Sequence, residues 1–158
     1  MNKINQLLEH LNISQVFIAG QIPTDMISFC EENLEKVSGI GLIGTTEIDS
    51  SPFKSHGHRT IIISSNKGIT HSAASNLKSD IPEVRKFELK EYEILPWTDI
   101  ALDRASELVE GLSTFFLGLN CNETTIHEAT SEGKIDDIYY IIKGVGPPLV
   151  LLPFMLSA

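Results

Sequence analysis

Short apolar runs alternate with segments of helical periodicity through most of the chain. Strands are predicted where apolar and β-branched residues gather in short runs: Val16–Ala19, Gly39–Ile43, Thr60–Ser64 and Val84–Leu89. Helices are predicted where apolar residues recur every three or four positions: Asn2–Leu11, Pro23–Val37, Ile69–Leu77 and a long helix that begins at Thr98. This alternation predicts an α/β fold, with a mostly parallel open sheet and helices on both faces.

The pattern changes after Asn120. Two strands are predicted at Thr124–Thr130 and Ile135–Ile142, joined as a hairpin whose turn is Glu132-Gly133-Lys134. A Gly- and Pro-rich break follows, and Leu149–Leu152 is predicted to be a last, buried strand. The length of 158 residues is that of one domain, which we expect to span residues 1–158.

Local residues predict several details of these elements. The long helix is expected to be capped by Thr98 and to carry one apolar stripe: Ala101, Ala105, Leu108, Val109, Leu112, Phe115 and Phe116. The helix from Pro23 is expected to bury Met26, Ile27, Cys30, Leu34 and Val37. Thr45–His58 is expected to be a polar loop. The Asp136-Asp137 pair is expected in a strand, with its side chains on opposite faces.

Composition narrows the classes of partner. The net charge is −9 and no block of Lys or Arg occurs, which argues against nucleic acid and against an anionic membrane surface. The longest apolar run, Pro147–Leu156, is too short to span a bilayer. Two distant cysteines, Cys30 and Cys121, indicate reduced thiols in a cytoplasmic protein. His56 and His58 lack a third ligand at useful spacing, so no metal and no cofactor is expected.

Two stretches resemble the α/β-hydrolase family. The first, from Leu7 through Gly20 and on to Glu35–Gly39, is similar to that family's helix, nucleophile strand, elbow, second helix and next strand. The second, Tyr139–Ser157, contains Gly-Val-Gly-Pro-Pro-Leu-Val-Leu-Leu-Pro. It is similar to the opening hairpin, the Gly-Pro-Pro link and the strand that leads into the oxyanion-hole loop.

The order of these two stretches is reversed relative to the family. The elbow half, residues 1–118, precedes the hairpin and Gly-Pro-Pro strand, residues 119–158, so the chain resembles a circular permutation. The family also places a further strand between its hairpin and the strand after the Gly-Pro-Pro link. The resemblance therefore implies a gap in the sheet or an unpaired edge, which invites pairing with another chain.

Two explanations account for the missing strand. Either the chain is a piece of a longer protein with a covalently attached further domain, or a homodimer completes the sheet by strand exchange. Truncation is favoured because the apolar segment Phe154–Ala158 is a poor place for a domain to end.

The resemblance also assigns positions to a catalytic triad. Within Gly20–Thr24 the nucleophile position carries Ile22, the acid position carries Asn66 and the base position carries Ile94. Acyl transfer needs a nucleophile, a base that takes its proton and an acid that orients the base. All three roles are unfilled, which implies a catalytically degenerate member. His71 is expected on a helix surface rather than in a base role.

These observations predict a non-catalytic, α/β-hydrolase-like interaction or regulatory module. One alternative is a hydrolase of small esters or acyl compounds, with residues supplied by a missing segment or a second chain. The other is a small-molecule binding domain with an apolar pocket. The residues expected to line that pocket are Gln21, Ile22, Ile94, Leu95, Trp97 and Phe154.

Overall fold

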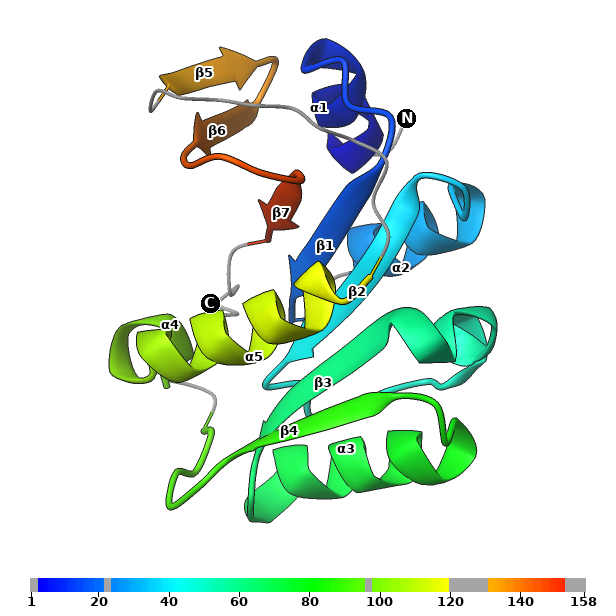
Figure 1. Cartoon of the computed structure of the whole chain (residues 1–158), viewed down its shortest axis with the longest axis vertical. Helices are drawn as coiled ribbons and strands as arrows, with labels where there is room; N and C mark the ends of the chain where they lie inside the picture. Colours follow the sequence, from blue (N-terminus) through cyan, green and yellow to red (C-terminus); the bar gives the residue numbers. More distant parts are fainter. Residues whose placement is uncertain (1–2, 22–23, 96–97, 120–130, 153–158) are drawn as a thin grey trace.

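Figure 1 shows the arrangement of the helices and strands in the computed structural model, which describes residues 3–21, 24–95, 98–119 and 131–152. The helices are α1 (Lys3–His10), α2 (Thr24–Glu32), the 3₁₀ helix η1 (Ser51–Arg59), α3 (Gly68–Asp80), α4 (Ile100–Asp103) and α5 (Ala105–Leu117). The strands are β1 (Val16–Gly20), β2 (Val37–Ile43), β3 (Thr60–Ser65), β4 (Arg85–Leu89), β5 (Ser131–Ile135), β6 (Ile138–Ile142) and β7 (Leu149–Leu151).

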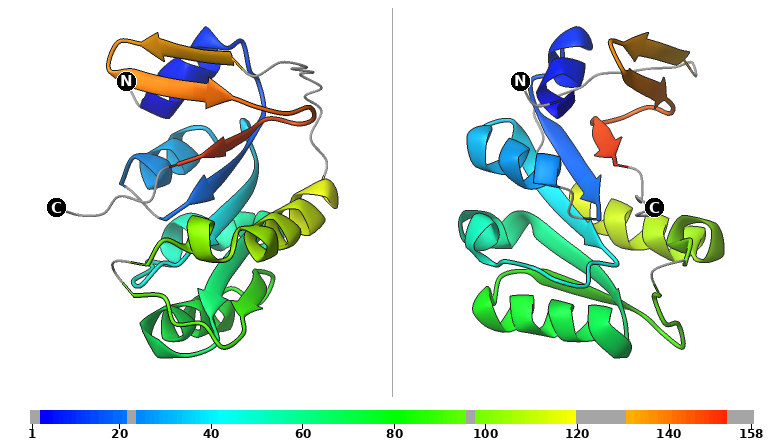
Figure 2. Two further views of the ribbon diagram at one scale, coloured as in Figure 1. Left: turned by 90° about the vertical axis from the view of Figure 1, so that its left-hand side faces the viewer. Right: turned by 180° about the vertical axis from the view of Figure 1, so that it is seen from behind.

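Five strands form a parallel sheet in the order β4-β3-β2-β1-β7. β1 lies inside the sheet, with Ile18 opposite Ile40 of β2 on one side and opposite Val150 of β7 on the other. β5 and β6 form a separate antiparallel hairpin. Both views of Figure 2 place this hairpin beyond β7, at the end of the molecule away from β4. The expected α/β class, the parallel sheet and a hairpin near the C-terminal end are confirmed.

Helices cover both faces of the sheet because successive strand residues point to opposite sides. On one face α1, α2, η1 and α3 pack on Ile18, Ile40 and Ile62. On the other face Leu112 and Phe116 of α5 pack on the alternate residues of β1–β3. Small residues let α5 approach closely, since a Cβ atom on Gly41 would lie 2.9 Å from Leu112 Cδ2.

The helix that follows β1 is shorter than expected. α2 ends at Glu32, and a turn in which Lys36 N–H donates to Asn33 O leads directly into β2. Val37 is therefore the first residue of a strand, paired with Val16, and not part of a helical face. Leu34 lies in this turn and is 44 % exposed.

The expected polar loop between β2 and β3 is largely the 3₁₀ helix η1. Pro52 stands in its first turn, where a missing N–H leaves no bond unmade. Phe53 and His56 are completely buried, and His58 is exposed. The sequence appears polar because the 3₁₀ helix buries only one side of a Ser-, His- and Lys-rich segment.

The long helix after β4 is broken at Arg104 into α4 and α5. Its cap is Asp99, whose carboxylate accepts from the N–H of Leu102, and not Thr98. Thr98 instead closes a turn, in which its hydroxyl accepts from Leu95 N–H. The expected stripe is therefore partly wrong. Leu108, Leu112 and Phe116 are buried, whereas Val109 is 65 % exposed and Ala101 and Ala105 are also exposed.

The hairpin turns at Asp136-Asp137 and not at Gly133. Asp136 takes a left-handed conformation, with φ of 51°, which short polar residues tolerate in two-residue turns. Gly133 lies within β5, where a Cβ atom would be 2.3 Å from the Tyr140 hydroxyl oxygen. The glycine is thus explained by the tyrosine across the hairpin. The expected strand Thr124–Thr130 lies outside the described residues.

β7 occupies the edge of the sheet, contrary to the expectation of a buried strand. Leu149 is 39 % exposed and Leu151 is 62 % exposed. Within the described ranges β7 pairs with β1 alone. The apolar run Leu149–Leu152 suggests a strand buried on both faces, but only one face is covered. On that face Val150 and Leu152 pack against the core.

Candidate functional site

The carboxyl end of β1 is the position at which an open α/β sheet of this order binds ligands. The chain adds β2, β3 and β4 on one side of β1 and β7 on the other, so the strand order reverses between β1 and β7. Crevices at such reversal points lie outside the carboxyl ends of the strands. Here β1 ends at Gly20 and α2 begins at Thr24, so a strand is followed closely by a helix, as expected from Val16–Ala19 and the helix from Pro23.

β7 closes tightly on the end of β1. Leu152 N–H donates to Ala19 O at 2.9 Å. A Cβ atom on Gly20 would lie 3.0 Å from Leu152 Cβ and 3.2 Å from Leu152 O. A glycine is therefore needed where β1 ends, because a larger residue would displace the last residues of β7.

The structure separates the positions expected for a triad. Ile22 lies outside the described residues. Asn66 follows β3, is exposed, and donates its backbone N–H to Leu89 O at 3.3 Å. Its side chain carries an amide, which has no ionisable group to orient a base.

Ile94, at the position expected for the base, belongs to the hydrophobic core. It is 5 % exposed and packs with Ile43 and Ile100 on the α5 side of the sheet. Gly44 comes close enough that its Cβ atom would be 2.6 Å from Ile100 Cδ1 and 3.3 Å from Ile94 Cγ2. Apolar packing therefore fills this position.

The expected apolar pocket is only partly covered by the described residues. Gln21 is half-buried and Leu95 is 37 % exposed, in the turn closed by Thr98. Ile22, Trp97 and Phe154 lie outside the described residues, so the pocket stays a prediction.

The histidines that the structure describes lie away from the end of β1. His56 and His58 precede β3, at the opposite end of the sheet. His71, on the surface of α3 as expected, has its Nδ1 2.9 Å from Glu88 Oε1 of β4. β4 is three strand spacings from β1, or about 14 Å. None of these three imidazoles is placed to activate a group at the β1–α2 turn.

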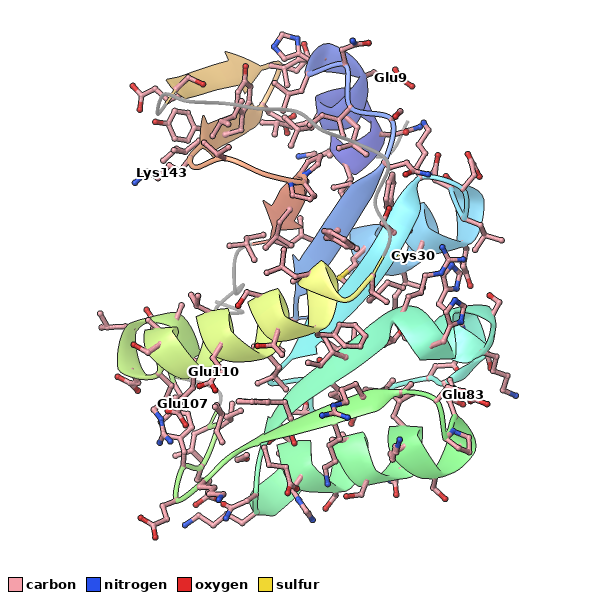
Figure 3. All side chains as sticks on the ribbon, viewed as in Figure 1. Glu9, Cys30, Glu83, Glu107, Glu110 and Lys143 are labelled. Atoms are coloured by element: carbon pink, nitrogen blue, oxygen red, sulfur yellow. The ribbon has the colours of Figure 1, made fainter. Side chains whose placement is uncertain are left out.

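Burial explains the chemistry of the two most enclosed titratable groups. Burial first, and then Arg59, lowers the pKa of His56, so its imidazole is held neutral. Burial first, and then Glu31, raises the pKa of the Cys30 thiol to about 12. Cys30 is a free thiol on α2 (Figure 3) and is a poor nucleophile in that state, because the thiolate is the reactive form. In the described part of the chain no three His, Cys, Asp or Glu residues are grouped to hold a metal ion.

Two hydroxyl groups near the carboxyl edge were missed by reasoning from the sequence. Thr45 Oγ1 and Ser64 Oγ are buried and have no hydrogen-bond partner among the described residues. By contrast, the hydroxyl of the next residue, Ser65, is hydrogen-bonded to Thr70, with Oγ and Oγ1 2.6 Å apart. The sequence feature that could have identified Ser64 is a hydroxyl residue at the end of an apolar run, here Thr60–Ser64.

A surface cavity of about 320 Å³ lies at the other, amino end of the sheet. It is bordered by the start of β2, the end of η1 and the end of α5. Its lining residues are Gln15, Glu35, Val37, Ser38, His58, Arg59, Gly118 and Leu119. Arg59 donates to Val37 O at 2.7 Å, so one guanidinium nitrogen holds the backbone of β2.

The fold and its candidate site define an α/β protein with an open parallel sheet and a strand–turn–helix at the reversal of strand order. Comparisons with family models, with curated proteins and with solved structures find no match to this chain. No helix within residues 3–21, 24–95, 98–119 and 131–152 is long and apolar enough to cross a membrane. The function is therefore argued from the geometry of the site.

Proposed function

We propose that this chain is a non-catalytic, α/β-hydrolase-like domain that works as an interaction or regulatory module. The observation that carries this proposal is the burial of Ile94. A general base must reach the proton that it abstracts. The side chain at the position expected for the base is instead packed against Ile43 and Ile100 in the core.

The arrangement around β1 supports the hydrolase-like part of the proposal. β1 runs through a short turn into α2, and β2 is its parallel neighbour on one side. On the other side β1 pairs with β7, which follows the link Gly146–Pro148. A strand from the end of the chain thus lies beside the first strand, as a circular permutation requires.

The remaining triad positions support the absence of catalysis. Ile22 has no nucleophilic atom, and the exposed amide of Asn66 carries no charge. Acyl transfer by a triad depends on its members acting as a unit, so with all three positions unfilled no triad mechanism operates.

A fluorophosphonate probe tests this proposal directly. We expect the folded chain to stay unlabelled under conditions that label an active serine hydrolase completely. Heat-denatured chain is the matched control for nonspecific reaction. Stoichiometric labelling of the folded chain would favour the alternative, a hydrolase of small esters or acyl compounds.

A single substitution tests the same point from the other side. The Ile22→Ser variant restores a hydroxyl at the nucleophile position but leaves Asn66 and Ile94 unchanged. Since no base is supplied, we expect hydrolysis of p-nitrophenyl acetate to stay at the rate of the unsubstituted chain. Robust esterase activity from this one change would contradict the proposal.

A further inference from the structure

The outer edge of β7 carries backbone groups that have no strand partner among residues 3–21, 24–95, 98–119 and 131–152. Phe17 N–H donates to Pro148 O, and Leu152 N–H donates to Ala19 O. In a parallel pair, alternate residues of one strand bond to the same neighbour. Residues 148, 150 and 152 therefore face β1, and the N–H and C=O groups of Leu149 and Leu151 point away from it.

The side chains at this edge are apolar and uncovered on one face. Leu149 lies opposite Phe17 and Leu151 opposite Ala19, both in the core beneath α5. Paired residues of adjacent strands share a face, so both leucines lie on the α5 side. They are nevertheless 39 % and 62 % exposed.

The hairpin lies beyond β7 but, within the described residues, does not pair with this edge. Its strands pair only with each other within the described residues, and it is held against α1 by polar contacts. Tyr140 OH lies 3.1 Å from His10 Nε2, so Tyr140 faces α1. Its neighbours Tyr139 and Ile141, on the opposite face of β6, are 60 % and 54 % exposed. The hairpin thus presents exposed apolar side chains of its own.

We propose that the outer edge of β7 is a docking site for an extended segment of a partner protein, with alternating apolar residues and basic flanks, which adds to the sheet as a sixth strand. This inference rests on the proposed interaction role and names the class of partner. The added segment forms main-chain hydrogen bonds with Leu149 and Leu151. The apolar side chains of this segment cover the two exposed leucines.

Charge and size select this occupant over a second copy of the chain. The chain carries 21 acidic and 12 basic residues, a net charge of −9, so a basic segment is attracted and a second copy is repelled. β7 is also only three residues long. A stable dimer needs roughly 800 Å² from each partner, far more than a three-residue edge presents.

The test uses the full chain and a fluorescent peptide of five alternating valines and threonines between two pairs of lysines. Binding is measured by fluorescence anisotropy, with a glutamate-flanked peptide and a backbone N-methylated peptide as controls. The Leu151→Pro variant removes the N–H that faces the partner and keeps the bonds to β1. Leu151→Ala is its matched control, because it keeps that N–H.

We expect the lysine-flanked peptide to bind to the unsubstituted chain. The Leu151→Pro variant should bind this peptide at least about tenfold more weakly, because it loses one main-chain hydrogen bond and weakens the adjacent ones. Leu151→Ala should weaken binding less than Leu151→Pro does, since only side-chain area is lost and the N–H remains. Amide exchange of Leu151 should slow when the peptide binds. The N-methylated peptide should not bind, and this arm decides the question even where Leu151→Pro fails to fold.

Four results would overturn the inference. These are no binding, equal binding by Leu151→Pro and the unsubstituted chain, equal binding of the glutamate-flanked peptide, and a doubling of mass with concentration that Leu151→Pro abolishes. The last would identify a second copy as the occupant. Fluorophosphonate labelling would contradict the proposed function alone, whereas absent peptide binding by an unlabelled chain would contradict only the docking site.

Discussion

The two ends of the sheet differ in how completely they are covered. β2 and β3 are enclosed by neighbouring strands and by helices on both faces, and every one of their residues is buried. β7 has one neighbouring strand and a leucine that is 62 % exposed, although its sequence is as apolar as theirs. Composition alone therefore does not separate a core strand from an edge strand; the number of covered faces and edges does.

The largest expected effect lies in the covered region. Ile62 of β3 is completely buried among residues from α2, α3 and η1. Ile62→Ala should lower the free energy of unfolding by about 2–5 kcal/mol, because it removes buried methyl groups and leaves a cavity. Urea titration followed by circular dichroism measures this change.

The matched control at the other end is Leu151→Ala. That side chain is 62 % exposed, so its loss should change the free energy of unfolding by no more than about 0.5 kcal/mol. Equal losses for Leu151→Ala and Ile62→Ala would show that β7 is as much a part of the core as β3, and the contrast between the two ends would be wrong.

An intermediate effect is expected from pH, again in the covered region. Burial, with Arg59 nearby, lowers the pKa of His56. The unfolded chain therefore binds a proton more readily than the folded chain, and stability is lost as pH falls below about 6.5 towards the lowered value. The pKa of Glu88 is also lowered, by its hydrogen bond with Lys86, so the stability that this carboxylate contributes is lost only at more acidic pH than that of His56.

The His56→Gln variant separates this effect from other titrations. Its loss of stability between about pH 7.5 and about pH 5 should be smaller than that of the unsubstituted chain. The comparison uses urea unfolding at both pH values, with His58→Gln as a control that changes an exposed histidine of the same segment. A slope unchanged by His56→Gln would contradict the neutral, buried state of His56.

What could be predicted from the sequence follows the same contrast. β1, β2 and β3 were located within two residues at each end, because their apolar runs reflect burial on both faces. Gly133 misled the placement of the hairpin turn, since its role depends on Tyr140 across the hairpin, a contact that a linear pattern does not contain. The exposure of β7 likewise depends on neighbours distant in the chain.

Some features of the candidate site could be predicted from the sequence, and others depend on contacts between distant residues. The strand–turn–helix after β1 was readable from Gly20 and the apolar run before it. The apolar character of Ile94 was also readable, but its packing on Gly44 and Ile100 required the fold. Thr45 and Ser64 were missed because a hydroxyl at a strand end has the same appearance whether it is bonded or not.

A local effect is expected in the hairpin. Tyr140 lies over Gly133 of β5 and contacts His10 of α1, while no described backbone bond joins the hairpin to the five-stranded sheet. Tyr140→Ala should therefore expose the β5 and β6 amides to faster exchange while the urea midpoint of the sheet stays the same. A local change of about 1 kcal/mol is expected, the scale of one cross-strand aromatic pair.

Tyr140→Phe distinguishes the two contacts of this tyrosine. The ring remains over Gly133, so the hairpin amides should keep most of their protection, and only the bond to His10 Nε2 is lost. Exchange followed residue by residue by NMR gives both readings on the same sample. A midpoint lowered by Tyr140→Ala as far as by Ile62→Ala would mean that the hairpin and the sheet unfold as one unit. The hairpin end of the molecule would then be part of the cooperative core, and the contrast between the two ends of the sheet would be wrong.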